Sequence, residues 1–235
     1  MPSTLHKDLL GQAIHDFWIT GEDLPIEVWM NGRRDGDMSA SVFFRKYAQM
    51  QSWDRQALRL SKGSVLDVGA GAGSHSLLLE QRGFDVSALE ISPLACEVMK
   101  ARGAKRVMNE DVLHVKGIPF DTVLLLMNGL GLLGTEQETL KLFRHLKKML
   151  TKGGQILGDS TDILYARMDS LGGFQDKGAY YGQVEFILKY KGKQSLPFNW
   201  LYLDPSLLSE LSDKAGLRCE IMYRSKDFHY LARLT

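Results

Sequence analysis

The chain has 235 residues, of which 44% are hydrophobic and 24% are charged, and its 29 basic and 28 acidic side chains leave a formal net charge of +1. This composition is typical of a globular protein and excludes the collagen-like, disordered and disulfide-scaffold classes. The charge balance also argues against a strongly basic nucleic-acid surface, because neutralising phosphates requires an excess of Lys and Arg.

The two cysteines, Cys96 and Cys219, lie far apart and in no metal-binding spacing, so we expect neither a metal site nor a disulfide framework. Charged residues interrupt the apolar residues at positions 1–17. The longest apolar stretch, 123–133, contains an Asn and is shorter than the roughly 18 residues that suggest a membrane span. We therefore expect no signal peptide, no membrane span and a cytoplasmic location.

The first 60 residues are predicted to form a helical extension. Apolar residues recur with helical spacing over 9–18 and again over 41–60. Between these segments, an Asn-Gly and an Asp-Gly dipeptide indicate turns. We expect this extension, residues 1–60, to precede a single α/β domain, residues 61–235.

From Gly63 onward, short apolar runs alternate with helical segments, which is the pattern of a parallel sheet. Ser92-Pro93, Thr135 and Asp204-Pro205 are typical helix starts. Strands are predicted at 65–68, 86–90, 105–108, 122–127, 155–158, 184–190, 198–203 and 230–234.

The most specific motif is the segment Asp67-Val68-Gly69-Ala70-Gly71-Ala72-Gly73, where a predicted strand ends and a helix begins. Small residues there let a ligand approach the backbone, and the carboxyl ends of parallel strands form the ligand crevice of such sheets. A tight turn that binds nothing is the alternative interpretation.

The charges near this loop indicate which ligand it binds. Glu90 ends the next strand, 21 positions after Gly69, where a carboxylate can bind both hydroxyls of a ribose. A dinucleotide fingerprint would need Gly or Ala where the chain has Ser74, and Asp67 would repel a pyrophosphate. A nucleoside ligand with a cationic amino-acid end is favoured instead.

Residues 65–73 resemble motif I of the class I S-adenosylmethionine-dependent methyltransferases, and later segments resemble further family motifs in the same order. Glu90-Ile91 is similar to the pair that holds the ribose diol, Asp111-Val112 to the pair beside the adenine, and 121–128 to the motif IV strand whose end lies near the sulfonium. The segment 43–47 resembles a stretch that closes over the methionine end of the cofactor in some relatives, where Arg45 could pair with the carboxylate.

This resemblance implies an α/β, Rossmann-like, doubly wound fold with a mostly parallel seven-stranded sheet, an antiparallel last strand and an N-terminal helical extension. It implies transfer of a methyl group from S-adenosyl-L-methionine to an acceptor, which we expect to be an O or N atom of a small molecule. The cofactor-binding residues that it implies are Asp67, Gly69, Ala70, Gly71, Glu90, Ile91, Asp111, Val112, Met127, Asn128 and Arg45.

No catalytic residue is assigned, because methyl transfer from a sulfonium mainly requires alignment of donor and acceptor. Met127-Asn128-Gly129-Leu130 departs from the Asn/Asp-Pro-Pro-aromatic pattern of DNA-adenine and glutamine methylases, which argues against those activities. Cys96 lies in a predicted helix and is expected to be a small buried residue. His75 is a candidate for a ligand or cofactor role, weighed against an ordinary position at the start of a helix.

The acceptor is expected to lie against residues that follow Asp159, including 165–181, where Tyr180 and Tyr181 are candidate pocket aromatics. Nucleic acid is not expected as a partner, and the oligomeric state stays open. Two alternatives are a non-catalytic module that binds S-adenosylmethionine and a nicotinamide-dependent oxidoreductase on the same type of sheet.

Overall fold

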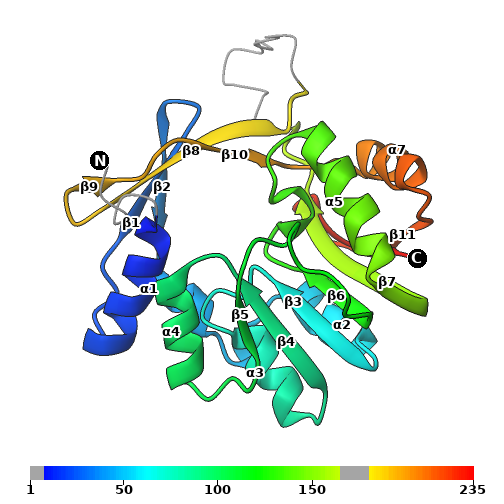
Figure 1. Ribbon diagram of the computed structural model, residues 1–235. Helices are drawn as coiled ribbons and strands as arrows, with labels where there is room; N and C mark the ends of the chain where they lie inside the picture. The colour runs from blue at the N-terminus through cyan, green and yellow to red at the C-terminus, as the bar shows by residue number, and fades with distance from the viewer. Residues whose placement is uncertain (1–7, 165–179) are drawn as a thin grey trace.

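The computed structural model describes residues 8–164 and 180–235, and Figure 1 shows a twisted sheet with helices on both faces. This sheet has seven strands in the order β11-β12-β7-β6-β3-β4-β5. The strands are β3 (Ser64–Val68), β4 (Asp85–Glu90), β5 (Val107–Asn109), β6 (Phe120–Leu125), β7 (Leu150–Thr161), β11 (Cys219–Arg224) and β12 (His229–Leu234).

Strands β3, β4, β5, β6 and β7 run parallel to one another. Strand β12 is antiparallel to β7, and β11 is antiparallel to β12. The predicted α/β fold with a mostly parallel seven-stranded sheet and an antiparallel last strand is therefore confirmed, because β12 alone runs opposite to the other six strands. Strand β7 is longer than the predicted 155–158, because the preceding helix ends at Lys148 and the chain pairs with β6 from Leu150.

Helices cover both faces of this sheet because its central strands are apolar on both sides. Val65 and Leu124 pack with α2 (Ser52–Leu60) and α3 (Ser74–Gln81) on one face. Leu66 and Val123 pack with α5 (Glu136–Lys148) and α7 (Pro205–Ala215) on the other face. Helix α4 (Pro93–Ala101) places Cys96, which is buried as expected, against Ala88 of β4.

The helix starts that the sequence indicates are present. The Ser92 hydroxyl accepts a hydrogen bond from the N–H of Ala95 at 3.0 Å, and the Thr135 hydroxyl accepts one from Glu138 at 3.2 Å. Asp204 accepts from the first two N–H groups after Pro205. Side chains at these three positions satisfy donors that a helix leaves unpaired at its N-terminus.

A second sheet, in the order β10-β8-β1-β2, includes part of the amino-terminal segment. Residues 26–38, for which the sequence indicated turns between two helical segments, form a β-hairpin that was not predicted. Its strands are β1 (Ile26–Met30) and β2 (Arg33–Met38), and they join β8 (Gln183–Tyr190), β9 (Lys193–Gln194) and β10 (Phe198–Leu201). Asn31 and Gly32 supply the two positive φ angles, +50° and +78°, of the hairpin turn.

The rest of the amino-terminal segment is helical. It contains α1 (Leu9–Thr20), the short 3₁₀ helices η2 (Ala40–Phe44) and η3 (Tyr47–Gln49), and α2. Asp8 caps α1 by accepting from the N–H of Gly11 at 3.1 Å, and it also accepts from the Ser92 hydroxyl at 2.9 Å. Figure 1 accordingly shows α1 beside α4. The division of the chain at residue 60 stays a prediction.

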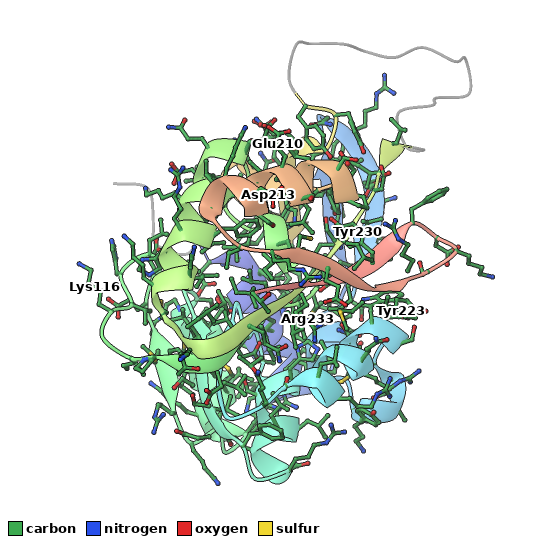
Figure 2. All side chains as sticks on the ribbon, turned by 90° about the vertical axis from the view of Figure 1, so that its right-hand side faces the viewer. Lys116, Glu210, Asp213, Tyr223, Tyr230 and Arg233 are labelled. Carbon is green, nitrogen blue, oxygen red and sulfur yellow. The ribbon has the colours of Figure 1, made fainter. Side chains whose placement is uncertain are left out.

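Two contacts tie the outer parts of the fold to the central sheet. In Figure 2 the β11–β12 hairpin lies beside α2, and the Tyr223 hydroxyl accepts a hydrogen bond from the Ser52 hydroxyl at 2.8 Å. Strand β10 reaches the end of β6, where the indole N–H of Trp200 donates to the carbonyl of Asn128 at 3.1 Å. No helix among the described residues has the length and apolar character required to cross a membrane.

Candidate functional site

The glycine loop between β3 and α3 leaves open space at one position. Gly69, Gly71 and Gly73 have φ angles of +70°, +57° and +81°, which L side chains rarely adopt. A Cβ at Gly69 would meet no described atom within 4 Å, whereas one at Gly71 would lie 2.9 Å from Cδ1 of Phe43. The loop is therefore covered by a phenyl ring at Gly71 and open at Gly69.

A pocket lies at this loop, at the carboxyl ends of β3 and β6. It brings together four of the predicted site residues, Asp67, Gly69, Ala70 and Met127. The residues lining it are Val42, Phe43, Asp67, Val68, Gly69, Ala70, Ser74, His75, Leu126 and Met127. This position at the carboxyl ends of parallel strands is where open α/β sheets bind their ligands.

Glu90, at the end of β4, is joined to the glycine loop by a hydrogen bond. Its Oε2 accepts from the N–H of Gly71 and its Oε1 accepts from the N–H of Ser92, both at 2.9 Å. Burial raises the pKa of this carboxyl group, although the backbone donors oppose the shift. Ile91 beside it is 69% exposed, an unusual position for a large apolar side chain.

The predicted pair after β5 has two different environments. Asp111 accepts a hydrogen bond from the N–H of Leu113 at 2.8 Å, and Val112 is buried in the main core. Asn109 donates from Nδ2 to the carbonyls of Glu90 and Ile91, at 2.9 and 3.0 Å. Asn109 belongs to none of the predicted motifs, and it meets Glu90 because β4 pairs with β5.

Asp67 is 2% exposed and lies beneath the loop, where its Oδ2 accepts a hydrogen bond from the Ser76 hydroxyl at 2.6 Å. Burial raises the pKa of its carboxyl group, while the charge of nearby His75 and the Ser76 hydrogen bond lower it. An ionised carboxylate held here destabilises the empty fold but can attract a cationic ligand group.

We expect this burial to give the unliganded protein a distinct pH dependence. Because the pKa of Asp67 is raised on folding above the ordinary value of 3.8, the folded state binds a proton more tightly than the unfolded chain, and stability falls as pH rises through that window. Asp67→Asn should therefore raise Tm at pH 7 by a few degrees. The gain should shrink as pH falls from 7 toward about 4, below which Asp67 is protonated in both the folded and the unfolded chain; a loss of stability at pH 7 would contradict this prediction.

The end of β6 contains two successive non-glycine residues with left-handed backbone. Met127 and Asn128 have φ angles of +62° and +61°. Such residues cost roughly 1–3 kcal/mol each and persist only when the surroundings hold them in place. The two predicted site residues of the motif IV strand therefore form a strained turn at the edge of the pocket.

Arg45 lies close to the pocket but is paired within the protein. One of its terminal nitrogens lies 3.1 Å from Oδ2 of Asp54, and its Nε donates to the carbonyl of Val42 at 2.9 Å. The other terminal nitrogen, Nη2, is buried and has no partner among the described residues. His75 lines the pocket, and its buried Nε2 is likewise unpartnered there.

Most of the segment expected to contact an acceptor, 165–179, lies outside the described residues. Tyr180 and Tyr181 are described, and their ring centroids are 4.5 Å apart. The Tyr180 hydroxyl donates to Asp204 and the Tyr181 hydroxyl donates to Asp162, both at 2.7 Å. Burial raises the pKa of both hydroxyl groups, which keeps them protonated at neutral pH.

Comparisons with known proteins agree with this geometry. A family model described as "Methyltransferase domain" matches residues 65–154. A crystal structure of an S-adenosylmethionine-dependent methyltransferase from Bacteroides fragilis, in complex with S-adenosyl-L-homocysteine, is 39% identical to the chain. It aligns over 99% of this chain and 96% of that one, with a TM-score of 0.89.

Two further relatives are more distant. "Putative methyltransferase YqeM" of Bacillus subtilis (strain 168) is 26% identical over 119 residues, so the match spans about half of that protein, 48% of its length and 48% of this chain. The structure of the CcbJ methyltransferase from Streptomyces caelestis is 15% identical, covers 79% of this chain and 96% of that chain, and has a TM-score of 0.60. The likeness to CcbJ concerns the fold alone.

Proposed function

The chain belongs to the S-adenosylmethionine-dependent methyltransferases, and from this membership we propose which of its residues bind the cofactor and which class of acceptor it methylates. The activity itself is methyl transfer with S-adenosyl-L-methionine as the donor. The proposal concerns the residues of this chain that carry out that transfer and the molecule that receives the methyl group.

The observation that carries the proposal is the order of three neighbouring parallel strands, β4, β3 and β6. Glu90 ends the first, the glycine loop follows the second, and Met127 follows the third. A ligand lying across this edge meets a carboxylate suited to a ribose diol, then backbone without side chains, then a strained turn. This order matches a nucleoside joined to an amino-acid end.

The polar atoms of the site fit the two charges of that amino-acid end. The buried Nη2 of Arg45, which no described residue pairs with, is a donor for its carboxylate, and the buried carboxylate of Asp67 attracts its ammonium group. Glu90 can still accept from the ribose hydroxyls, because each of its oxygens has a second lone pair. We place the exposed side chain of Ile91 against the adenine, and Asp111 and Val112 at its far edge.

The chemistry that the bound cofactor supplies is a methyl group activated by a sulfonium. What the protein adds is alignment: Glu90 and Asp67 fix the two ends of the binding site, so that the attacking atom meets the methyl group in line. A general base is required only for an acceptor that must lose a proton.

Gly69→Ala tests this placement with little disturbance to the protein. The new methyl group would meet no described atom within 4 Å, so it enters only the space proposed for the cofactor. We expect S-adenosylhomocysteine to bind about tenfold more weakly, with a stability loss of about 1 kcal/mol from the positive φ. Calorimetric titration gives the affinity and thermal unfolding gives the stability.

Gly83→Ala is the matched control, because Gly83 also has a positive φ, +88°, and open space around its Cβ position. It lies between α3 and β4, at the opposite end of β4 from Glu90. This variant should lose similar stability and keep its affinity. Equal affinities in the two variants would contradict the placement.

We propose a small-molecule acceptor that presents an O or N atom. The net charge of +1 does not favour a polyanion, and Trp200 from the second sheet, hydrogen-bonded to Asn128, brings an aromatic ring to the edge of the methyl-transfer site. Trp200 also packs with Tyr181 and Tyr202 in one apolar cluster. Aromatic side chains with engaged polar groups suit an organic substrate better than a nucleic-acid backbone.

Methyl-labelled cofactor tests the acceptor class. The protein would be incubated with panels of small amines, alcohols and phenols, and in parallel with transfer RNA and unfolded protein. Label transferred to the small molecules is the expected result. Label found only in RNA or protein would overturn the small-molecule proposal while leaving the methyltransferase activity intact.

A further inference from the structure

The strained turn at Met127–Asn128 is held by three hydrogen bonds to Asn128. Its N–H donates to Oδ2 of Asp159 at 2.9 Å, its side-chain oxygen accepts from the Thr161 hydroxyl at 2.9 Å, and its carbonyl accepts from Trp200 at 3.1 Å. Asp159 and Thr161 come from the end of β7, and Trp200 comes from β10. Two different sheets therefore fix one residue in a backbone conformation that costs free energy.

His229 bridges two of these three contacts. Its Nε2 lies 2.6 Å from Oδ2 of Asp159, and its Nδ1 lies 2.7 Å from the Thr161 hydroxyl oxygen. The antiparallel pairing of β12 with β7 makes His229 and Thr161 direct neighbours. The imidazole ring also stacks on Trp53 of α2, with the ring centroids 3.9 Å apart and the planes inclined by 21°.

The direction of these hydrogen bonds defines what His229 does. The carboxylate of Asp159 can only accept, so Nε2 of His229 donates to it, and Nδ1 lies within hydrogen-bonding distance of the Thr161 hydroxyl. Asp159 is 0% exposed, so this donor is one of the few groups that reach its carboxylate. His229 thus contacts both groups that hold Asn128 and fixes their orientation.

The position of the turn shows which part of the ligand it serves. Strand β3 lies between β4, which ends in Glu90, and β6, which leads into the turn. A ribose at Glu90 places the adenosine on the β4 side of the glycine loop and the amino-acid end on the β6 side. Asp54 and Asp159 each have a buried oxygen without a hydrogen-bond partner among residues 8–164 and 180–235, and the charge of Asp54 interacts with those of His75, Arg45 and Asp159.

We propose that His229 is a positioning residue for this site. Through Asp159 and Thr161 it holds the Met127–Asn128 turn in the conformation that receives the amino-acid end of the cofactor. The proposal rests on the proposed function, because it takes S-adenosylmethionine as the ligand. It assigns His229 no contact with the reacting atoms.

The affinities for two ligands, with and without the amino-acid end, distinguish this positioning role from general support of the fold. S-adenosylhomocysteine carries the amino-acid end, whereas 5′-methylthioadenosine has the same adenosine and thioether without it. His229→Phe keeps a ring that can stack on Trp53 but removes both hydrogen bonds. We expect this variant to bind S-adenosylhomocysteine at least about tenfold more weakly and methylthioadenosine less than about twofold more weakly.

Three more variants complete the experiment. His229→Gln can still donate to Asp159 and should recover part of the lost selectivity. Thr161→Val keeps the side-chain shape and removes one of the hydrogen bonds, so it should shift the ratio of the two affinities in the same direction. It tests the proposal even where His229→Phe does not fold. His114→Phe, at an exposed histidine, is the matched control and should change neither affinity.

Equal losses for the two ligands in His229→Phe and Thr161→Val would overturn the proposal, since they would show support of the whole fold. Unchanged affinities in both variants would overturn it as well. Failure of the wild-type protein to bind S-adenosylhomocysteine is a different result, and it would overturn the proposed function itself. Calorimetry on the four variants and the wild type distinguishes these outcomes.

Discussion

Gly71→Val is expected to abolish cofactor binding, with a loss of affinity for S-adenosylhomocysteine of more than about 100-fold. The φ angle of +57° is strongly unfavourable for a β-branched residue, and the new Cβ would lie 2.9 Å from the Phe43 ring. The N–H of Gly71 also donates to Glu90, so a shift of the loop would move the proposed ribose-binding carboxylate. Calorimetric titration of the folded variant measures the loss.

Gly83→Val provides the control for backbone strain. Gly83 has a φ of +88° and no described atom within 4 Å of its Cβ position, and it lies away from the pocket. We expect this variant to lose stability and to bind S-adenosylhomocysteine as the wild type does. If Gly71→Val bound the ligand with unchanged affinity, the glycine loop would not be the cofactor site.

Glu90→Ala is expected to weaken cofactor binding by about 1–3 kcal/mol, because charge-assisted hydrogen bonds to the ribose are lost. The structure adds a second reason, since the N–H groups of Gly71 and Ser92 would lose their acceptor. Calorimetry with S-adenosylhomocysteine and with its 2′-deoxy form separates the two causes. A ribose contact predicts that the preference for the 2′-hydroxyl disappears in the variant.

Glu90→Gln is the matched variant for that experiment. It keeps the size of the side chain and one oxygen acceptor but loses the charge, so its affinity should fall between those of the wild type and Glu90→Ala. A wild type that binds both forms of the ligand equally well would show that Glu90 only braces the loop.

The sequence predicted those parts of the fold that depend on local patterns. The buried strand before Gly69 follows from its apolar run, and the starts of α4, α5 and α7 follow from Ser92, Thr135 and Asp204. The β1–β2 hairpin was missed although its Asn31-Gly32 turn was recognised. Strand β2 is highly polar and has no alternating apolar residues. Its partner β1 also pairs with β8, more than 150 residues away in the chain, and no local pattern indicates that pairing.

The residues of the site likewise fall into two groups, those in contiguous motifs, which the sequence predicts, and those brought together by strand pairing, which it does not. Asp67, Gly69, Ala70 and Met127 were predicted from contiguous motifs, and the structure brings them to one pocket. Asp159 and His229 belong to no motif and meet only because β12 runs antiparallel to β7. Arg45 was expected to face a carboxylate of the ligand. The structure shows one of its nitrogens on Asp54 of α2 and another without a partner in the described part of the chain.

We propose that the pocket at the carboxyl ends of β3 and β6 binds a nucleoside with an amino-acid end. The most direct test is a parallel calorimetric titration of the wild-type protein with S-adenosylmethionine, S-adenosylhomocysteine and NAD(H). We predict saturable binding of the first two and none of the third. Binding of NAD(H) alone, or of none of the three, would contradict the account, whereas tight binding without turnover on every acceptor panel would favour a non-catalytic module.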